Sequence, residues 1–287
     1  MSGRRRRGRG RLRRLAAHAV LLLACAAVLA PLLWVVDLAL RPGAGLGGGP
    51  VFDPRLWTLD NLRALTGSRD AAGQPLFWRQ FANSLGVAAA SAVLGTSLAS
   101  SAAYALSRFS FPGRRAGLGF LFAVQMFPGV LAAVPIYILL DAAGLIDSLL
   151  GLVLVYASTA LPFAIWMLKG FFDQVPRELE EAARVDGAGP WQAFARVALP
   201  LVRPGLMVTV LFCFMGAWNE FILAATFLHA EPRYTLPVVL QQQVGAYGAR
   251  WELFAAGALV VSLPVVVLFY ALQRHLVGGL TAGALKG

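Results

Sequence analysis

The sequence is poor in acidic residues, cysteine and histidine, and these shortages narrow what the protein can do. It has 14 Asp and Glu against 25 Lys and Arg, with two cysteines and three histidines in 287 residues. Cys25 and Cys213 both fall in apolar runs, so they indicate neither a disulfide framework nor a metal cluster. The phosphate-binding pattern G-x-x-x-x-G-K-[ST] is also missing, because neither Lys169 nor Lys286 has the required neighbours. We therefore expect no ATP hydrolysis by this chain.

Apolar residues are abundant instead. They make up 58% of the chain, and the mean hydropathy is +0.68, above the roughly half-apolar composition of soluble domains. A bilayer core requires about 20 mostly apolar residues per helix. A single apolar run of this length could be a buried helix of a soluble protein, but several such runs together favour a membrane protein. The sequence predicts an all-α integral membrane protein with six transmembrane helices, at residues 15–40, 81–106, 116–140, 149–168, 205–228 and 254–272.

The positive charges predict the orientation of these helices. If the first residue lies inside, most of the 25 Lys and Arg residues fall in inner segments, as the positive-inside rule requires. We therefore expect a multi-pass protein of the cell inner (cytoplasmic) membrane with both termini in the cytoplasm. The net charge of +11 then reflects how the helices insert into the membrane, and it indicates no nucleic-acid partner. Each N-terminal arginine could also contribute about 1 kcal/mol of attraction to anionic lipid.

The N-terminus contains two resemblances to processing signals. Arg13 and Arg14 resemble a twin-arginine export signal, and the Leu-Leu-Ala-Cys run ending at Cys25 resembles a lipoprotein cleavage site. The apolar run continues for about 15 residues past the cysteine, which suits an uncleaved spanning helix. We expect a basic cytoplasmic N-terminus, residues 1–14, followed by a transmembrane domain, residues 15–287.

Two connecting segments have recognisable turn signals. Residues 41–80 form a predicted outer loop with a short helix over residues 59–65, for which Thr58 or Asp60 could provide the N-cap. Residues 107–115 form an inner turn that contains a proline-glycine pair.

Residues 169–203 are a polar segment between apolar runs. At roughly 3 kcal/mol per charge at the bilayer centre, this segment must lie in water. Its pattern predicts one helix that opens at Pro176 and ends near Gly187, and a second that begins at Gly189 and Pro190 and stops at Pro200. Negative charges in the first turns of the first helix suit its dipole: Glu178, Glu180 and Glu181.

This pair of helices has the features of a contact surface. Ala182 and Ala183 would let a partner approach closely, and Trp191 and Phe194 offer aromatic anchors. The apolar face of the second helix comprises Trp191, Phe194, Ala195 and Ala198. An amphipathic hairpin lying on the bilayer fits the same residues, and the residues alone do not separate the two interpretations.

The run EAARVDGAG, followed by VALP, resembles the EAA loop in the membrane subunits of binding-protein-dependent ABC importers. The matching positions are Glu181, Ala182, Ala183, Gly187, Val197, Leu199 and Pro200, with Val197 in place of the usual isoleucine. Further runs, including WNEFILAATFL from Trp218 and YTLPVVLQQQ from Tyr234, resemble the smaller, six-helix permease subunits of maltose-type carbohydrate importers. The resemblance covers about residues 52–287.

This resemblance implies a transport function without enzymatic activity. The chain would carry maltose, maltodextrin or a related sugar across the membrane by alternating access, and an importer for a different sugar or a glycerol-phosphate-type solute is the alternative. It implies no cofactor on this chain, since ATP and Mg would bind to partner ATPase subunits. The implied partners are a second permease subunit, an ATPase dimer, an extracytoplasmic sugar-binding protein and membrane lipid.

The resemblance also implies roles for particular residues. The ATPase-coupling knob, implied within the coupling loop of residues 169–203, would comprise Glu181, Ala182, Ala183, Asp186 and Gly187. In similar permeases, the loop corresponding to residues 229–250 reaches the binding protein, which makes candidates of Gln241, Gln242, Gln243 and Tyr247. Asn219 and Glu220 lie within the fifth predicted span, where a carboxylate is costly and often functional. A structural hydrogen bond between helices explains them better than contact with the sugar.

Two other classes of membrane protein fit the sequence less well. A secondary transporter would show paired ionisable groups at mid-membrane and an internal repeat, whereas Glu220 is almost alone there and no clear repeat is present. An intramembrane hydrolase would need a serine and a histidine together, or a metal cluster. The histidines, which are His18, His229 and His275, have no evident partner.

Overall fold

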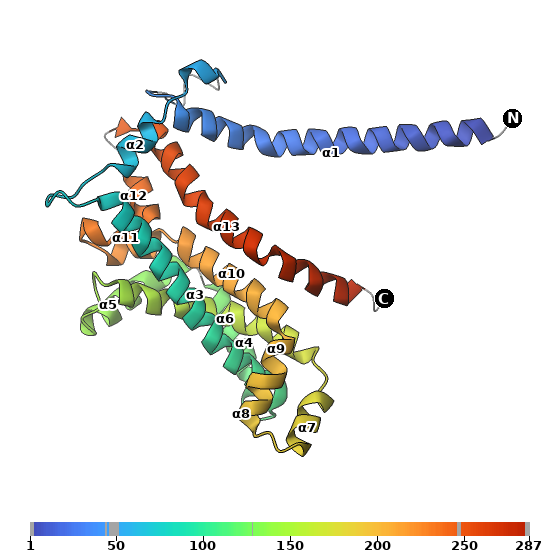
Figure 1. The fold of residues 1–287 in the computed structure, drawn as a ribbon. Coiled ribbons are helices and arrows are strands. Elements are labelled where there is room, and N and C mark those ends of the chain that lie inside the picture. Colours follow the sequence, from blue (N-terminus) through green and yellow to red (C-terminus); the bar gives the residue numbers. More distant parts are fainter. Residues whose placement is uncertain (1–2, 44, 46–51, 128, 246–247, 285–287) are drawn as a thin grey trace. The chain divides into compact units, whose positions relative to one another are not determined.

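The computed structural model describes residues 3–43, 45, 52–127, 129–245 and 248–284, with side chains described between residues 13 and 273. The chain divides into two compact units. One comprises residues 1–68 and 240–261, and the other comprises residues 69–239 and 262–287. Both consist almost wholly of helices (Figure 1), as the sequence predicts.

Among the residues that the structure describes, four helices are long and apolar enough to cross a membrane. They are residues Arg13–Leu40 of α1 (Gly3–Leu40), α3 (Leu76–Arg108), α6 (Leu149–Asp173) and residues Trp251–Gln273 of α13 (Trp251–Ala284). These match the first, second, fourth and sixth predicted spans. Within the described residues, two sharply bent helix pairs raise the number to six if each pair counts as one span.

The core of the larger unit is formed by α3, α6 and α10 (Arg203–Asn219), which pack against one another. The buried face of α3 consists largely of small residues, so the helices approach closely. A Cβ on Gly95 would lie only 3.5 Å from the carbonyl oxygen of Ala157 on α6. The small buried residues of this face are Ser84, Ala88, Ser91, Ala92, Gly95, Ala99, Ser100, Ala103 and Ser107.

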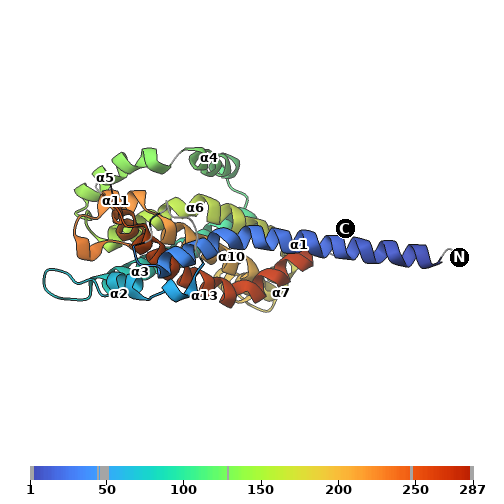
Figure 2. The ribbon, with the colours of Figure 1, turned by 90° about the horizontal axis from the view of Figure 1, so that it is seen from above.

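The third predicted span, residues 116–140, is broken rather than continuous. It comprises α4 (Arg114–Met126), a 3-10 turn η3 (Gly129–Ala132) and α5 (Ala133–Ala142), with a bend of 98°. Phe127, which precedes a proline, adopts an extended conformation, because proline disfavours a helical residue before it. Figure 2 shows α4 and α5 following one another beside α6.

The fifth span, residues 205–228, was predicted as a single helix, and this prediction is also wrong. Helix α10 ends at Asn219, Glu220 is extended, and a separate short helix α11 (Ile222–Phe227) follows. At about 1.5 Å per residue, the 17 residues of α10 fall short of a bilayer core. The bend instead joins α10 to the preceding helical segment, at 79°.

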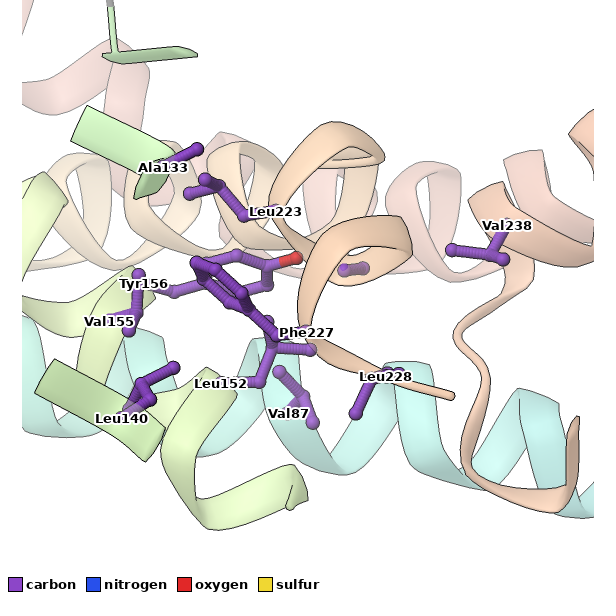
Figure 3. Close-up of a cluster of buried hydrophobic side chains, with 11 residues drawn as sticks. Val87, Ala133, Leu140, Leu152, Val155, Tyr156, Leu223, Phe227, Leu228 and Val238 are labelled. Atoms are coloured by element: carbon purple, nitrogen blue, oxygen red, sulfur yellow. The ribbon is translucent and has the colours of Figure 1, made fainter. Parts of the chain in front are cut away.

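A second cluster of buried side chains links α11 to α3, α5, α6 and α12 (Leu236–Gln242). Figure 3 shows Phe227 of α11 beside Tyr156 and Leu152 of α6. The cluster comprises Val87, Ala133, Leu140, Leu152, Val155, Tyr156, Leu223, Ala224, Phe227, Leu228 and Val238. This packing fixes α11 at the end of the unit that also holds α5, opposite the end where α7 and α8 lie (Figure 1).

The segment between α6 and α10 forms two short helical pieces. The first is α7 (Glu178–Val185), and the second runs through α8 (Pro190–Gln192), a π-helical stretch η4 (Ala193–Ala198) and α9 (Leu199–Leu201). The predicted starts at Pro176 and at Gly189 and Pro190 are close to those observed. The predicted stop at Pro200 is one residue short of the observed end, because α9 ends at Leu201 and Val202 is its C-cap.

The smaller unit holds the end of α1 against α2 (Asp60–Thr66) and the start of α13. Its buried carboxylate, Asp37, accepts a hydrogen bond from the indole of Trp57 at 3.0 Å and pairs with Arg41. The short predicted helix is confirmed, although its N-cap is Leu59 rather than Thr58 or Asp60. Residues 13–33 of α1 are exposed. The remaining elements of the chain are η2 (Pro54–Leu56), η5 (Glu231–Arg233), β1 (Val244–Gly245) and β2 (Gly248–Ala249).

Candidate functional site

The turn between α7 and α8 is organised by Gly187. This glycine has a φ of +91°, a conformation that costs other residues energy and that commonly ends a helix. Its N–H donates to the carbonyl of Arg184 at 3.0 Å, and the N–H of Ala188 donates to that of Ala183 at 2.9 Å. These bonds satisfy the last carbonyl groups of α7 and turn the chain toward Pro190. The predicted end of the first helix at Gly187 is thereby confirmed.

The predicted coupling residues lie close together, with Glu181, Ala182 and Ala183 on α7 and with Asp186 and Gly187 in the turn after it. Glu181, Ala182, Asp186 and Gly187 are exposed, and Ala183 is half-buried. Two large apolar side chains nearby are mostly exposed to solvent: Val185 is 88% exposed and Trp191 is 71% exposed. The sequence reasoning identified Trp191 but missed Val185. The two exposed apolar side chains make this end of α7 and α8 a candidate contact surface.

Phe194 does not belong to that surface, which corrects its assignment as an exposed anchor. It is only 5% exposed, and its ring packs against Tyr104 of α3 at 4.7 Å and Phe172 of α6 at 6.3 Å between centroids. Ala198, on the same predicted face, is fully buried. The apolar face of this helix therefore packs on the protein's own helices, while Trp191 remains outside.

Glu180 is a buried carboxylate that the sequence reasoning treated only as a charge near a helix start. Its side chain is 3% exposed, and Oε1 lies 2.6 Å from Nε of Arg108, which is 6% exposed. The other oxygen, Oε2, accepts a hydrogen bond from the Tyr104 hydroxyl at 2.6 Å. Both partners come from the end of α3, some 72 residues away along the chain. The coupling segment is thus fixed to α3 by a buried ion pair.

Glu220 and Asn219 occupy the break between α10 and α11. Glu220 accepts a hydrogen bond from the Tyr156 hydroxyl of α6 at 2.6 Å, and it also accepts from the backbone N–H groups of Leu223 and Ala224. It therefore links two helices and satisfies the first N–H groups of α11. Asn219 is exposed and donates to the carbonyl of Met215 in its own helix. These bonds are consistent with the predicted structural hydrogen bond of Glu220 between helices.

The residues predicted to contact a binding protein differ in how exposed their side chains are. Gln241 and Gln242 are exposed at the end of α12, while Gln243 is half-buried, and its side chain accepts from Arg250 at 2.8 Å. Tyr247 lies outside the described residues. The preceding part of this segment is a packed helix rather than an extended loop, because Leu236 and residues 238–240 are buried.

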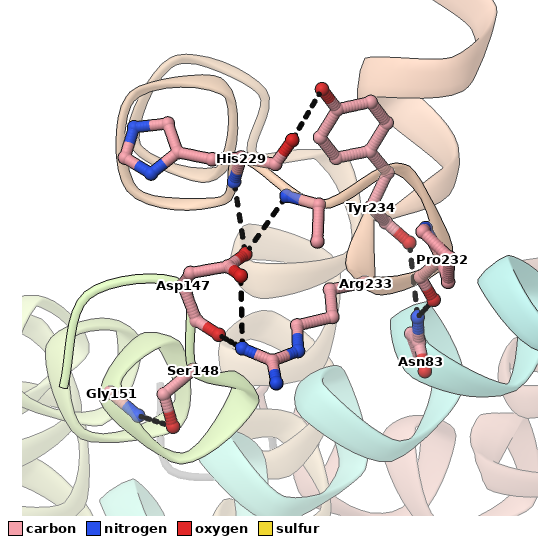
Figure 4. Close-up of polar contacts among 9 residues, drawn as sticks. Asn83, Asp147, Ser148, Gly151, His229, Pro232, Arg233 and Tyr234 are labelled. Carbon is pink, nitrogen blue, oxygen red and sulfur yellow. Dashed lines mark hydrogen bonds and ion pairs between the residues drawn. The ribbon is translucent and has the colours of Figure 1, made fainter.

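A charged clamp holds the α5–α6 turn against the segment after α11. Asp147 accepts from the backbone N–H groups of His229 and Ala230 at 3.0 and 3.1 Å, and its carboxylate lies 2.9 Å from the Arg233 guanidinium (Figure 4). Arg233 also donates to the Asp147 carbonyl. Partial burial acts to raise the pKa of Asp147, but these backbone donors and Arg233 hold that pKa below its ordinary value. The clamp was not predicted.

Because this pKa is lowered by folding, the clamp should stabilise the protein only while Asp147 is ionised. We expect Asp147→Asn to lower the free energy of unfolding at neutral pH by at most about 1 kcal/mol, because the pair is so exposed, and to lower the melting temperature accordingly. Asn tolerates the φ of +55° at this position. The difference from the wild type should begin to shrink as the pH falls below about 4, the ordinary range of an Asp carboxyl, and should vanish only below the lowered native pKa, where the carboxylate is protonated in both states. Thermal unfolding of both proteins in detergent at several pH values measures this; a gap independent of pH would contradict it.

These features define a multi-helix membrane protein with a helical core of α3, α6 and α10, at one end of which lie two short helical pieces, residues 178–201, which we call the elbow. Residues 91–281 match the family of the binding-protein-dependent transport system inner membrane component. The chain belongs to this family. The predicted all-α membrane class is confirmed by that match and by the apolar helices described above.

Individual relatives cover almost the whole chain. The trehalose transport system permease protein SugB of Mycobacterium tuberculosis is 36% identical over 261 residues, which cover 90% of this chain and 93% of that protein. The maltose/maltodextrin transport system permease protein MalG of Escherichia coli is 37% identical over 282 residues, covering 94% and 95%. The crystal structure of a bacterial ABC transporter that imports alginate contains a similar fold, with a TM-score of 0.77, 22% identity and coverage of 92% and 96%.

Proposed function

We propose that this chain is the permease subunit of an ABC importer that carries a carbohydrate across the cytoplasmic membrane. The observation that carries the proposal is that α7 and the turn around Gly187 bring the predicted coupling residues together, most of them exposed, at one end of the packed helices. The membrane family supports it, as do relatives named for trehalose and for maltose and maltodextrin transport.

In this proposal, ATP is hydrolysed by partner subunits and the chain itself is not an enzyme. An ATPase dimer would grip the turn formed by Glu181, Ala182, Ala183, Asp186 and Gly187. Closure of that dimer on ATP and Mg would then bias the permease between inward-open and outward-open states. The exposed apolar side chains of Val185 and Trp191 would supply contact area, in the way that aromatic anchors dominate many interfaces.

The other partners follow from the same architecture. A second permease subunit would complete the pathway, because α10 is short and residues 13–33 of α1 are exposed along their whole length. An extracytoplasmic sugar-binding protein would contact Gln241 and Gln242, with Gln243 and Tyr247 beside them in the sequence. Both termini would lie in the cytoplasm, with residues 1–14 as a basic segment and residues 15–287 as the permease domain.

Co-purification tests the proposal most simply. The chain, expressed with an affinity tag in its native host, should bring down an ATPase, a second permease subunit and a carbohydrate-binding protein. Uptake of labelled oligosaccharides, competed with unlabelled sugars and with glycerol phosphate, then separates the sugar function from the glycerol-phosphate alternative. A chain that purifies without any ATPase, although folded and membrane-inserted, would contradict the proposal.

A further inference from the structure

The start of α4 carries two arginines without a hydrogen-bonding partner in the described part of the chain. Arg114 and Arg115 are the first two residues of this helix, and no hydrogen bond or ion pair occupies either guanidinium among the described residues. Arg114 is attracted electrostatically to Asp173 of α6, but Lys169 and Ser107 already bind that carboxylate at 2.5 and 2.6 Å. The donors of both arginines are therefore available to a ligand.

Two open cavities lie at this pair of arginines. The lining of the first, of about 760 Å³, includes both arginines, Phe111 and Leu118. The second, of about 540 Å³, shares Arg114 and extends over the ends of α3 and α6. The charged side chains of the two linings are Arg108, Arg114, Arg115, Lys169 and Arg177 on the basic side and Asp173 and Glu178 on the acidic side. Even with Arg108 neutralised by Glu180, positive charge exceeds negative charge there, so the local field attracts an anion.

Helix α4 continues from the two arginines as an apolar surface. None of its residues is buried, and Phe120, Phe122 and Met126 are all more than half exposed. Together with the segment after it, α4 forms one of the bent pairs that are long and apolar enough to span a membrane. Basic side chains at the end of an apolar span lie at the level of the lipid headgroups, and the apolar side chains beyond them contact acyl chains. The surface therefore matches a molecule with a charged end and an apolar body.

We propose that Arg114 and Arg115 bind the phosphate group of an anionic phospholipid, whose acyl chains lie along α4. Guanidinium groups suit this role because their planar donors form two parallel hydrogen bonds to phosphate oxygens, and the first turn of α4 adds the positive end of its helix dipole. A soluble phosphate could use the same donors, but it would leave the apolar side chains of α4 uncovered. In the proposed orientation the lipid belongs to the cytoplasmic leaflet, and its binding does not require an ATPase.

Photolabelling of the full-length chain in nanodiscs tests the inference. The probe is phosphatidylglycerol with a diazirine on an acyl chain, present as a minor component of phosphatidylcholine, and mass spectrometry locates the label. We expect the label on the apolar residues of α4, and about 30-fold weaker labelling there by phosphatidylcholine with the same diazirine, which corresponds to about 1 kcal/mol for each of the two arginines. Equal labelling of α4 by the two lipids would overturn the inference.

Replacement of both arginines by glutamine, Arg114→Gln with Arg115→Gln, should reduce the labelling of α4 by phosphatidylglycerol to the level seen with phosphatidylcholine. The matched control is Arg69→Gln with Arg79→Gln, because these two exposed arginines lie near the start of α3, away from α4. The control should be labelled on α4 like the wild type. Labelling that survives in the glutamine pair, or that falls equally in the control, contradicts the assignment of the site to Arg114 and Arg115.

Arg114→Lys with Arg115→Lys separates lipid binding from the charge that membrane insertion requires. Lysine keeps the positive charge but lacks the paired donors of a guanidinium. We therefore expect this variant to insert normally, even where the glutamine pair does not. Its labelling by phosphatidylglycerol should fall between the wild-type level and the level seen with phosphatidylcholine. Wild-type labelling of the lysine pair would show that charge alone suffices and would overturn the inference.

Two additions to the wild-type experiment identify the occupant of the site. Water-soluble glycerol phosphate, at the concentration of the lipid probe, should leave the labelling of α4 unchanged because it does not cover the apolar side chains. The labelling should also persist in the complex of co-purified subunits. Loss of the label to glycerol phosphate would assign the site to a soluble phosphate, and loss in the complex would assign the arginines to a protein contact. Either result would overturn the inference.

Discussion

Gly187→Pro is expected to abolish sugar-stimulated ATP hydrolysis by the assembled complex while leaving the chain inserted in the membrane. Proline holds φ near −65° and has no N–H, whereas Gly187 has a φ of +91° and donates to the carbonyl of Arg184. The turn must therefore rebuild, at a cost of about 3 kcal/mol or more. The side chains on either side of the turn would no longer share one surface. ATPase assays in proteoliposomes, with insertion checked by carbonate extraction, measure the effect.

Gly73→Pro is the matched control for this substitution. Gly73 also has a positive φ, +76°, and its N–H donates to the carbonyl of Asp70 at 2.9 Å, but it lies in the turn between α2 and α3. We expect it to disturb its own turn and to leave ATP hydrolysis near the wild-type rate. Gly187→Asn should also keep activity, because asparagine tolerates a left-handed backbone. Wild-type transport by Gly187→Pro would contradict the coupling role of the turn.

Trp191→Ala is expected to weaken the association of the ATPase about 30-fold, equivalent to the 2 kcal/mol typical of an aromatic hot spot. The indole is 71% exposed and rests on the ring of Phe194 at 5.2 Å between centroids. Its removal should therefore cost the isolated subunit little stability. Titration of purified ATPase onto the permease in nanodiscs, followed by light scattering or fluorescence, gives the affinity.

Trp78→Ala provides the comparison, because Trp78 is 52% exposed and also rests on phenylalanine rings. It lies near the start of α3, away from the elbow, and should not affect ATPase binding. The same pair of variants distinguishes a protein partner from the bilayer. If Trp191→Ala leaves ATPase affinity unchanged and instead weakens binding of elbow peptides to anionic vesicles, the amphipathic-hairpin interpretation is favoured.

The sequence predicted well those features that depend on local chemistry. Apolar runs of sufficient length located α3 and α6, because burial in lipid imposes a minimum length on a helix. Glycine and proline located the ends of α7 and the start of α8, because each has a distinctive backbone preference. The EAA pattern coincides with α7 and the exposed turn after it, where its predicted coupling residues lie, and their coupling role stays a prediction.

The features that were missed depend on contacts between distant parts of the chain. Glu180 stands next to Glu181 in a charged run, and nothing local shows that one is buried and the other exposed. Its partner Arg108 lies 72 residues away. Phe194 has the helical spacing of an exposed face, and only the position of Tyr104 shows that its ring is covered.

The breaks in the third and fifth predicted spans were marked in the sequence less clearly than the ends of α7 and the start of α8. The proline-glycine pair after Phe127 could have indicated the break between α4 and α5. Glu220 was recognised as unusual for a membrane segment, but its role in ending α10 and beginning α11 follows from bonds to Leu223, Ala224 and Tyr156. A carboxylate that satisfies the first N–H groups of a helix stops the preceding helix as well.

Cross-linking from Ala183 tests the central claim most directly. A single cysteine at this half-buried position of α7, in a chain whose native Cys25 and Cys213 are replaced, should cross-link to an ATPase subunit through a short bifunctional reagent. A cysteine at Ala143, exposed at the other end of the helical core, should not. The account predicts a covalent permease–ATPase product for Ala183→Cys alone. No product with linkers of several lengths, in a complex that still transports sugar, would contradict it.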